Sequence, residues 1–391
     1  MNWIKDLLKA TDELEPPERY FYWSGLATIS AILRRQVFMD RFSYILYPNI
    51  FVILMGGSGL RKALPVSYSR SMVERLDITK VISGRCSVQG ATKELGKMIT
   101  LESGGQLRNA CGMLVSGEFA AYLVDDPKAL TILTDLYDSH AHEKYKTSFK
   151  NQTEDTLVNV CVTMLSATNE VQWLDSVRGT AIGGGFLART FLVQENKKRL
   201  LNSLMDRPKH LDLMNGLAKK LEPITKLEGP AVLDTEARTY FDAWYKKFNS
   251  IEYQDSTGTL ARIHDQALKV SILLRAAECE DLVIGRRHIV EAIEKSLECY
   301  GAVKRVSSGT GGGSMAAQTK VVLDYLMKAP EYSMARKKLL QKGWGSFDSI
   351  DLDRVMETLT QMSAVIVERI GKDWQYTLTK KYVEAYESLE D

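Results

Sequence analysis

The chain has 391 residues, of which 45% are hydrophobic and 26% charged, and these near-average values exclude fibrous, collagen-like and wholly disordered proteins. Lys and Arg together number 51 and Asp and Glu 49, a net charge of +2, so any basic surface for nucleic acid must be local. The five cysteines are widely spaced, which favours reduced core residues over disulfides or a zinc site. No run is apolar for long enough to cross a membrane, and we expect a cytoplasmic protein of about two to three domains.

The predicted elements begin with an N-terminal helical segment over residues 1–35, because apolar residues recur there at helical spacing. Four apolar, β-branched runs follow, each typical of a buried parallel strand: residues 49–55, 112–116, 158–165 and 190–193. Helical stretches separate these runs, which predicts a doubly wound α/β core over residues 36–210. Residues 211–306 show helical periodicity throughout and are expected to form a helical domain.

A Gly/Ser-rich run marks the clearest boundary and predicts a flexible linker over residues 307–317. In the tail, residues 318–391, three short amphipathic helices precede two β-rich segments that flank a Gly-Lys-Asp turn. This order of elements predicts a winged helix, which binds either DNA or protein. A small α/β dimerisation module is the alternative interpretation.

The first strand runs into a glycine-rich turn, which in such a position points backbone N–H groups at a phosphate. The turn consists of Gly56, Gly57, Ser58, Gly59, Leu60, Arg61, Lys62 and Ala63. A lysine at the offset of Lys62 reaches the terminal phosphates of a nucleotide. Arg61 replaces the second glycine of the G-x-x-x-x-G-K-[S/T] pattern, and Ala63 replaces the hydroxyl residue that binds Mg²⁺. A glycine turn with a surface lysine is the alternative.

Further polar residues lie next to the other strands. Glu118 follows the second strand, where a P-loop ATPase carries the glutamate that orients the attacking water. The preceding position, where an aspartate would hold Mg²⁺, is Gly117. Asn169 follows the third strand, where a polar side chain can touch the γ-phosphate or the water. Arg189 precedes the fourth strand, and an arginine there could complete the site of a neighbouring subunit.

This ordered set resembles that of the replication ATPases of phages and mobile elements, which are often joined to primase domains, and more distantly the MCM-type AAA+ helicases. The resemblance covers about residues 18–305 and rests on Trp23, residues 47–49, 58–62, 116–118 and 184–189, and Arg262. It implies that Lys62 binds phosphate, that Glu118 polarises water and that Asn169 assists. It also implies an arginine finger at Arg189, a sensor at Arg262 on a helical lid (residues 211–306), ATP as the ligand and a homo-oligomeric ring, expected to be a hexamer.

The two positions that normally fix Mg²⁺ have both lost their ligand, because Ala63 and Gly117 carry no oxygen donor. Ser116 or Ser58 could substitute through a water molecule. The combined loss makes a role for Mg²⁺ doubtful and leaves the metal ligands unassigned. It favours slow hydrolysis, or nucleotide binding without turnover.

Two segments are candidates for holding DNA. Between the second and third strands, lysines alternate with aromatic residues, which fits a strand that contacts both phosphates and bases: Lys144, Tyr145, Lys146 and Lys150. In the resembled helicases this interval projects a hairpin into the central pore, and a solvated hairpin is the alternative. The third helix of the tail is acidic and argues against groove readout, so the expected basic face of the tail is Arg336, Lys337, Lys338 and Lys372.

The sequence thus predicts an ATP-dependent, ring-forming DNA helicase or translocase in phage or mobile-element replication. Its expected partner is single-stranded or forked DNA, with primase among the candidate protein partners. Two alternatives remain open. One is a nucleotide-binding DNA-assembly factor, such as a helicase loader or origin-binding regulator, with weak or no hydrolysis. The other is a scaffold that needs no nucleotide.

Overall fold

The computed structural model describes residues 2–84, 86–97, 99–100, 106–107, 109–123, 128–138, 144–147, 155–170, 172–173, 185–202, 207–253, 255–310, 314–371 and 373–387. The chain divides into two compact units, Met1–Arg305 and Val306–Asp391. Within the described ranges, no helix is both long and apolar enough to cross a membrane.

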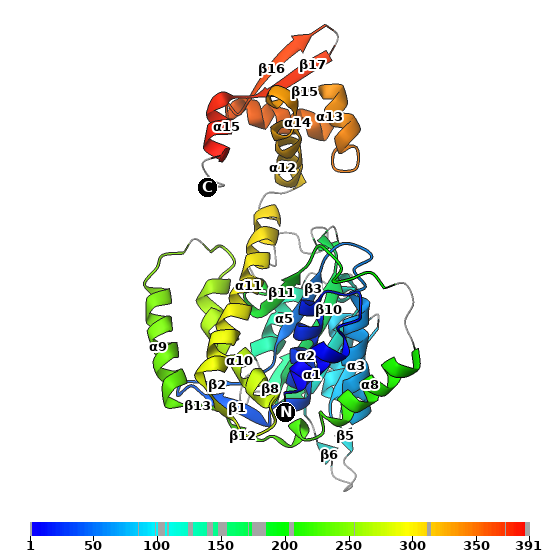
Figure 1. Cartoon of the computed structure of the whole chain (residues 1–391), viewed down its shortest axis with the longest axis vertical. Helices are drawn as coiled ribbons and strands as arrows, with labels where there is room; N and C mark the ends of the chain where they lie inside the picture. Colours follow the sequence, from blue (N-terminus) through cyan, green and yellow to red (C-terminus); the bar gives the residue numbers. More distant parts are fainter. Residues whose placement is uncertain are drawn as a thin grey trace. The chain divides into compact units, whose positions relative to one another are not determined.

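The centre of the first unit is a five-stranded sheet of parallel strands in the order β11-β3-β10-β7-β4, of which β11, β3 and β10 are labelled in Figure 1. Every residue of β3, β7 and β10 is buried. Continuous apolar runs of this kind form parallel strands that are covered on both faces, and the predicted α/β class is confirmed. The strands are β3 (Phe51–Met55), β4 (Lys80–Ser83), β7 (Cys111–Ser116), β10 (Cys161–Thr168) and β11 (Thr190–Gln194).

Helices cover both faces of this sheet, because alternate residues of a strand point to opposite sides. On one face, Val52 and Leu54 join the core that is formed with α2 and α3. On the other face, Phe51 packs edge-on against Tyr137 of α5, with ring centroids 5.1 Å apart. The helices of these layers are α1 (Trp3–Ala10), α2 (Glu18–Leu33), α3 (Ala63–Leu76), α4 (Val88–Gly96), α5 (Ala129–Asp138) and α8 (Arg207–Lys219).

Short strands and single turns join the larger elements. β1 (Val37–Asp40) pairs with β2 (Ile45–Leu46) and β12 (Gly229–Pro230), β13 (Val232–Leu233) with β14 (Val283–Ile284), β5 (Ile99–Thr100) with β6 (Gln106–Leu107), and β8 (Lys144–Thr147) with β9 (Asp155–Val158). The single turns of 3₁₀ helix are η1 (Phe119–Tyr122), η2 (Leu187–Arg189), η3 (Ile224–Lys226) and η4 (Pro330–Tyr332).

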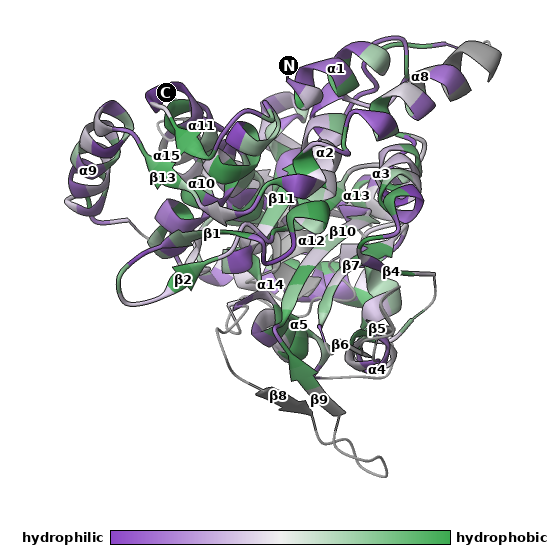
Figure 2. Ribbon diagram, turned by 90° about the horizontal axis from the view of Figure 1, so that it is seen from below, coloured by the Kyte–Doolittle hydropathy of each residue, from purple (hydrophilic) through white to green (hydrophobic). Residues whose placement is uncertain are grey.

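Three helices follow the sheet: α9 (Thr235–Asn249), α10 (Thr259–Ala276) and α11 (Arg286–Thr310). α10 is buried along most of its length and contacts both α2 and η2. α9 is coloured mostly hydrophilic in Figure 2, and its buried residues are Ala237 and Phe241. α10 is therefore fixed against the sheet domain, and α11 is joined to α2 as well, where the Tyr22 hydroxyl donates to Glu291 at 2.9 Å.

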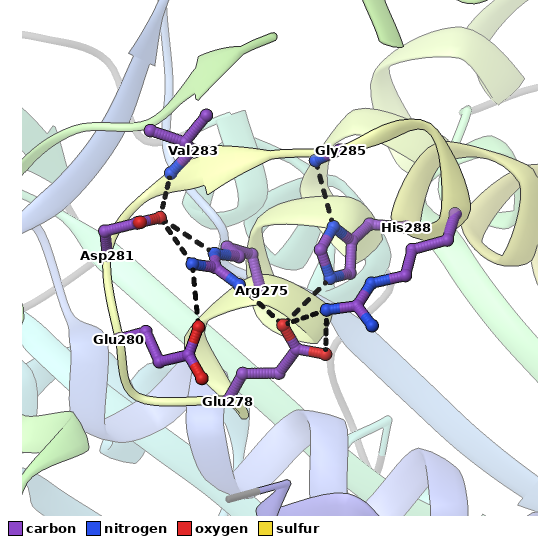
Figure 3. Close-up of polar contacts among 8 residues, drawn as sticks. Arg275, Glu278, Glu280, Asp281, Val283, Gly285 and His288 are labelled. Carbon is purple, nitrogen blue, oxygen red and sulfur yellow. Dashed lines mark hydrogen bonds and ion pairs between the residues drawn. The ribbon is translucent and has the colours of Figure 1, made fainter. Parts of the chain in front are cut away.

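A buried arginine joins the end of α10 to the start of α11 (Figure 3). The guanidinium of Arg275 donates to Glu278 at 2.6 Å and to Asp281 at 2.6 and 2.9 Å. Asp281 also accepts from the backbone N–H of Val283, and Glu278 contacts His288 Nε2 at 3.2 Å. Burial acts to raise the pKa of Glu278, but His288, Arg275 and Arg287 outweigh it and lower that pKa. This cluster fixes the turn between the two helices.

The second unit has its own core of fifteen buried apolar residues. Its sheet is antiparallel in the order β15-β17-β16, and β16 pairs with β17 from Val365↔Leu378 to Ile370↔Asp373. Asp348 and Asp351 form a capping box that starts α14. The elements are α12 (Ser314–Met327), β15 (Ser333–Ala335), α13 (Arg336–Gly343), α14 (Ser349–Gln361), β16 (Val365–Ile370), β17 (Asp373–Leu378) and α15 (Lys380–Glu387).

Three differences from the expected elements affect the domain boundaries and the central sheet most. β4 was not expected, because a four-residue edge strand with an exposed end leaves little apolar signal. α8 crosses the expected boundary between residues 210 and 211 and packs with α1 and α3, where Trp3 Nε1 donates to the carbonyl of Leu217 at 3.0 Å. α11 continues to Thr310, into the expected linker, because extending an existing helix costs only about 1 kcal/mol at a glycine.

Candidate functional site: the loop after β3 and the two edges of the sheet

The glycine-rich turn connects β3 to α3 at the carboxyl edge of the sheet, and glycine is required at two of its positions. A Cβ at Gly56 would lie 2.4 Å from the carbonyl oxygen of Glu195 and 2.6 Å from the hydroxyl of Tyr20. Gly59 has φ +93°, a conformation that L side chains rarely adopt. Arg61 takes φ 54°, the left-handed region, at the position where the pattern has its second glycine. Arg61 therefore adopts the left-handed backbone conformation that the glycine of the pattern would adopt, although a side chain disfavours it.

Lys62 folds back over this loop. Its Nζ donates to the carbonyl oxygens of Gly56 at 2.7 Å and of Gly57 at 2.9 Å. Partial burial lowers the pKa of the Lys62 ammonium. The residue directly precedes α3, whose dipole favours an anion at this end; in its first turn Leu64 donates its N–H to the carbonyl of Arg61 and Pro65 has no N–H. The loop therefore places one cation and a helix N-terminus at the same spot.

Glu15 fastens the outer side of the loop, and sequence reasoning missed it. Its carboxylate forms ion pairs with Arg61 Nε and, at 3.1 Å, with Lys198 Nζ. The hydrogen bond from Lys198, together with the charge of Arg61, lowers the pKa of Glu15. Glu15 is 8% exposed. Arg61 thus points toward Glu15, away from the carbonyls that Lys62 binds.

Glu118 and Asn169 lie at the same edge as Lys62. β10 lies between β3 and β7, with Thr168 opposite Met55 and Ser166 opposite Ser116. Asn169 follows Thr168 directly, so it comes between the Lys62 loop and exposed Glu118. The Asn169 amide exchanges hydrogen bonds of 2.8 Å with Gln172. The Ser116 hydroxyl donates to the Glu118 carbonyl at 2.8 Å, so it supports the turn that presents this glutamate.

Arg189 lies at the opposite, amino edge of the sheet. Arg189 directly precedes Thr190, which is opposite Phe51, the first residue of β3. The Lys62 loop instead follows Met55, the last residue of β3. Five residues of strand separate the edges by roughly 15 Å. Arg189 is 8% exposed and forms a two-pronged ion pair with Asp138, with both N···O distances at 2.8 Å. Within its own chain, this arginine cannot reach a ligand of Lys62.

Arg262 of α10 lies at the same amino edge. One turn further along the helix, Gln266 donates to the carbonyl of Ala188 at 2.8 Å. Arg262 lines a cavity of about 440 Å³. The same cavity is also lined by Tyr44, Asp138, Asp265 and Lys269. The structure thus groups the predicted residues into two sets, with Arg189 and Arg262 away from Lys62, Glu118 and Asn169.

The candidate DNA segments are described in part. Lys144, Tyr145 and Lys146 lie on β8, which pairs antiparallel with β9, so the expected hairpin has its paired strands. Lys150 and Lys372 lie outside the described residues. Lys337 and Lys338 are exposed on α13. Arg336 is turned toward α14, where Nη2 binds both carboxylate oxygens of Asp353 at 2.9 Å. The positive charge of Arg336 is therefore balanced by Asp353 in this structure.

Two more residues at the amino edge were missed in the sequence. Lys269 is 4% exposed, and its only sequence signal is a charge inside the apolar face of α10. Asp138 ends α5 and had no signal at all beyond its charge. No group of three or more His, Cys, Asp or Glu residues within the described ranges is arranged to hold a metal ion.

Comparison of the chain with models of known protein families, and with curated proteins, gives no match.

Proposed function

We propose that this chain is a nucleotide-binding P-loop protein of the AAA+ type that binds ATP at the loop between β3 and α3. The observation that carries the proposal is the position of Lys62 over the Gly56 and Gly57 carbonyls at the N-terminus of α3. A terminal phosphate brought to this point would take over the two hydrogen bonds and gain charge attraction. Glu118 and Asn169, on the next two strands, are then beside the same phosphate.

Hydrolysis would use Glu118 to orient water and an arginine to stabilise charge in the transition state. Arg189 and Arg262 lie at the far edge of the sheet, so we propose that a second copy of the chain brings them to the nucleotide. A closed ring of such contacts, expected to be hexameric, gives every copy one complete site. The cavity beside Arg262 and Asp138 would then receive the neighbour's nucleotide.

We propose DNA as the partner of this ring, in the replication of a phage or mobile element and with primase as a candidate protein partner. The paired strands β8 and β9 support a hairpin that carries Lys144 and Lys146. The order of three helices and an antiparallel hairpin in the second unit supports a winged helix. Because Arg336 is paired with Asp353, the exposed Lys337 and Lys338 would carry most of the positive charge on the basic face of the second unit.

A second candidate function is a nucleotide-binding assembly factor with weak or no hydrolysis. It is favoured by one specific observation: α3 begins at Ala63, and Gly117 precedes Glu118, so neither usual Mg²⁺ position has an oxygen donor. A helicase loader or origin-binding regulator would need binding without rapid turnover.

ATP binding and ATP hydrolysis, each measured with and without Mg²⁺ and single-stranded DNA, separate these functions. A helicase or translocase binds ATP and hydrolyses it faster when DNA is present. An assembly factor binds ATP without DNA-stimulated turnover. The absence of ATP binding under every condition would leave only the scaffold and would contradict the proposal.

A further inference from the structure

We infer that Lys269 is a positioning residue for Arg189: it fixes the end of α5, whose last residue, Asp138, aims the guanidinium of Arg189. This inference rests on the proposed role of Arg189 in a neighbour's site. It adds a residue of α10 that acts without touching the nucleotide.

Lys269 is an unusual residue to find in this place. The ammonium donates to the backbone oxygen of Asn49 at 3.0 Å and to its side-chain oxygen at 2.9 Å. It also lies 3.8 Å from the centre of the Tyr137 ring. Both hydrogen bonds that the ammonium makes in the described part of the chain thus go to uncharged oxygens of one residue. Burial lowers its pKa to about 7, although Cys161, Asp265 and Asp138 act in the opposite direction. Burying a lysine amine is costly unless it is hydrogen-bonded, and the two Asn49 oxygens supply those hydrogen bonds.

The contacts of Asn49 carry the position of Lys269 to the end of α5. The Asn49 amide, oriented by the lysine, donates to the carbonyl of Tyr137 at 2.7 Å and to that of Val162 at 3.3 Å. Asp138 is the next residue after Tyr137, and its carboxylate binds Nε and Nη2 of Arg189. Lys269, Asn49 and the Tyr137–Asp138 peptide therefore form one connected polar chain that ends at the guanidinium.

α10 reaches the other partner of the ion pair as well. Gln266, one turn before Lys269, donates to the carbonyl of Ala188, the residue before Arg189. The same helix therefore fixes the backbone next to Asp138 and the backbone next to Arg189. Arg262, on the preceding turn, lines the cavity that also contains Asp138 and Lys269. A ligand that shifts α10 through Arg262 would therefore shift the aim of Arg189.

The inference is tested by the chemical reactivity of Arg189. The full-length protein is labelled with phenylglyoxal, and the modified fraction of Arg189 is measured by peptide mass spectrometry without nucleotide. Lys269→Met keeps the side-chain length and removes the ammonium. It should raise the labelling rate of Arg189 by about five- to thirtyfold, as expected for one or two lost hydrogen bonds of about 1 kcal/mol each. Asp138→Asn is the positive control, and Lys246→Met, at a lysine whose side chain is 74% exposed on α9, is the matched negative control.

A rate for Lys269→Met equal to that of the wild type would overturn the inference, since a lysine that only fastened α10 would leave Arg189 protected. If this variant does not fold, Asn49→Ser decides in the same way, because it removes the amide donor to Tyr137 and keeps Lys269.

Hydrolysis provides a second readout. Lys269→Met alone should lose turnover with unchanged ATP affinity, and mixing with Glu118→Gln should restore it, because the mixed interface contains an intact Arg189 and an intact Glu118. No recovery on mixing, where an Arg189→Ala and Glu118→Gln mixture does recover, would overturn the inference. Absence of hydrolysis in the wild type would count against the proposed helicase or translocase activity alone, since the labelling result stands without it.

Discussion

Replacing Lys62 by alanine tests the phosphate-binding loop, and its effect can be worked from the contacts. In the free protein the ammonium makes two hydrogen bonds to neutral carbonyls, at 2.7 and 2.9 Å. Each of these bonds from a charged donor is worth about 1.5 kcal/mol net, whereas a bond from an ammonium to a phosphate, in which both partners are charged, is worth about 2.5 to 3 kcal/mol. The difference for two bonds, about 2–3 kcal/mol, corresponds to a roughly 30–150-fold rise in the Kd for ATP.

Isothermal titration calorimetry of the purified protein with ATP measures this change. The fold should be retained, because the lost bonds lie at a partly exposed loop, and we expect less than about 1 kcal/mol of destabilisation. Arg70→Ala is the matched control: it removes one positive charge from an exposed site on the same helix, where Arg70 lies near Glu74, and should leave the Kd unchanged. An unchanged ATP affinity in Lys62→Ala would refute the phosphate-loop reasoning.

Three further predictions follow from the same contacts. Ala63→Ser supplies a hydroxyl at the first residue of α3 and should make ATP binding and hydrolysis more dependent on Mg²⁺, measured by titration with and without EDTA. Replacing Lys144, Lys146 and Lys150 together by alanine should weaken single-stranded DNA binding and flatten the salt slope by about two units, at roughly 0.7 per phosphate contact, as measured by fluorescence anisotropy. Glu278→Gln should lower the free energy of unfolding at neutral pH by about 1–2 kcal/mol, because the amide can still accept the hydrogen bond from Arg275 but lacks the negative charge that strengthens it.

The pH dependence of the Glu278 variant has a definite sign. The folded-state pKa of this carboxyl is lowered, so its contribution is present above the ordinary glutamate value of 4.5 and is lost as the pH falls through the folded-state pKa. The difference in Tm between variant and wild type should therefore shrink in acid, and a constant difference from pH 7 to pH 3 would contradict this assignment.

For the variant that lacks Lys144, Lys146 and Lys150, DNA binding equal to that of the wild type at every salt concentration would contradict the proposed DNA-binding hairpin. For Ala63→Ser, an EDTA response identical to wild type would contradict the proposed metal position.

Local patterns predicted much of the sheet and the loop. The apolar runs over residues 49–55 and 112–116 correspond to β3 and β7, because buried parallel strands carry a continuous signal in the sequence. The positions of Lys62, Glu118 and Asn169 at one edge follow from strand direction, since parallel strands end at the same side of a sheet. β4 had no such signal, because it is short and only partly buried.

The partners of the candidate residues could not be predicted, because they are far apart in the chain. Lys269 and Asn49 are 220 positions apart, and neither has a pattern that reveals the other. Glu15 lies in the amphipathic N-terminal segment, whose pattern predicts a helix but does not indicate that Glu15 pairs with Arg61. The sequence likewise predicted an arginine finger at Arg189 but not the ion pair that Arg189 forms with Asp138. Asp138 ends α5, which lies between β7 and β10 in the chain, far from Arg189 in the sequence.

The measurement that tests the central claim most directly is ATP hydrolysis by mixtures of Arg189→Ala and Glu118→Gln proteins. Each variant alone should bind ATP and turn it over slowly or not at all. Mixed in equal amounts, they should recover up to about a quarter of wild-type activity, because about one interface in four combines Glu118 from an Arg189→Ala copy with Arg189 from a Glu118→Gln copy. A mixture that stays as inactive as its components at every ratio, while the wild type hydrolyses ATP, would contradict a site shared between copies of this chain.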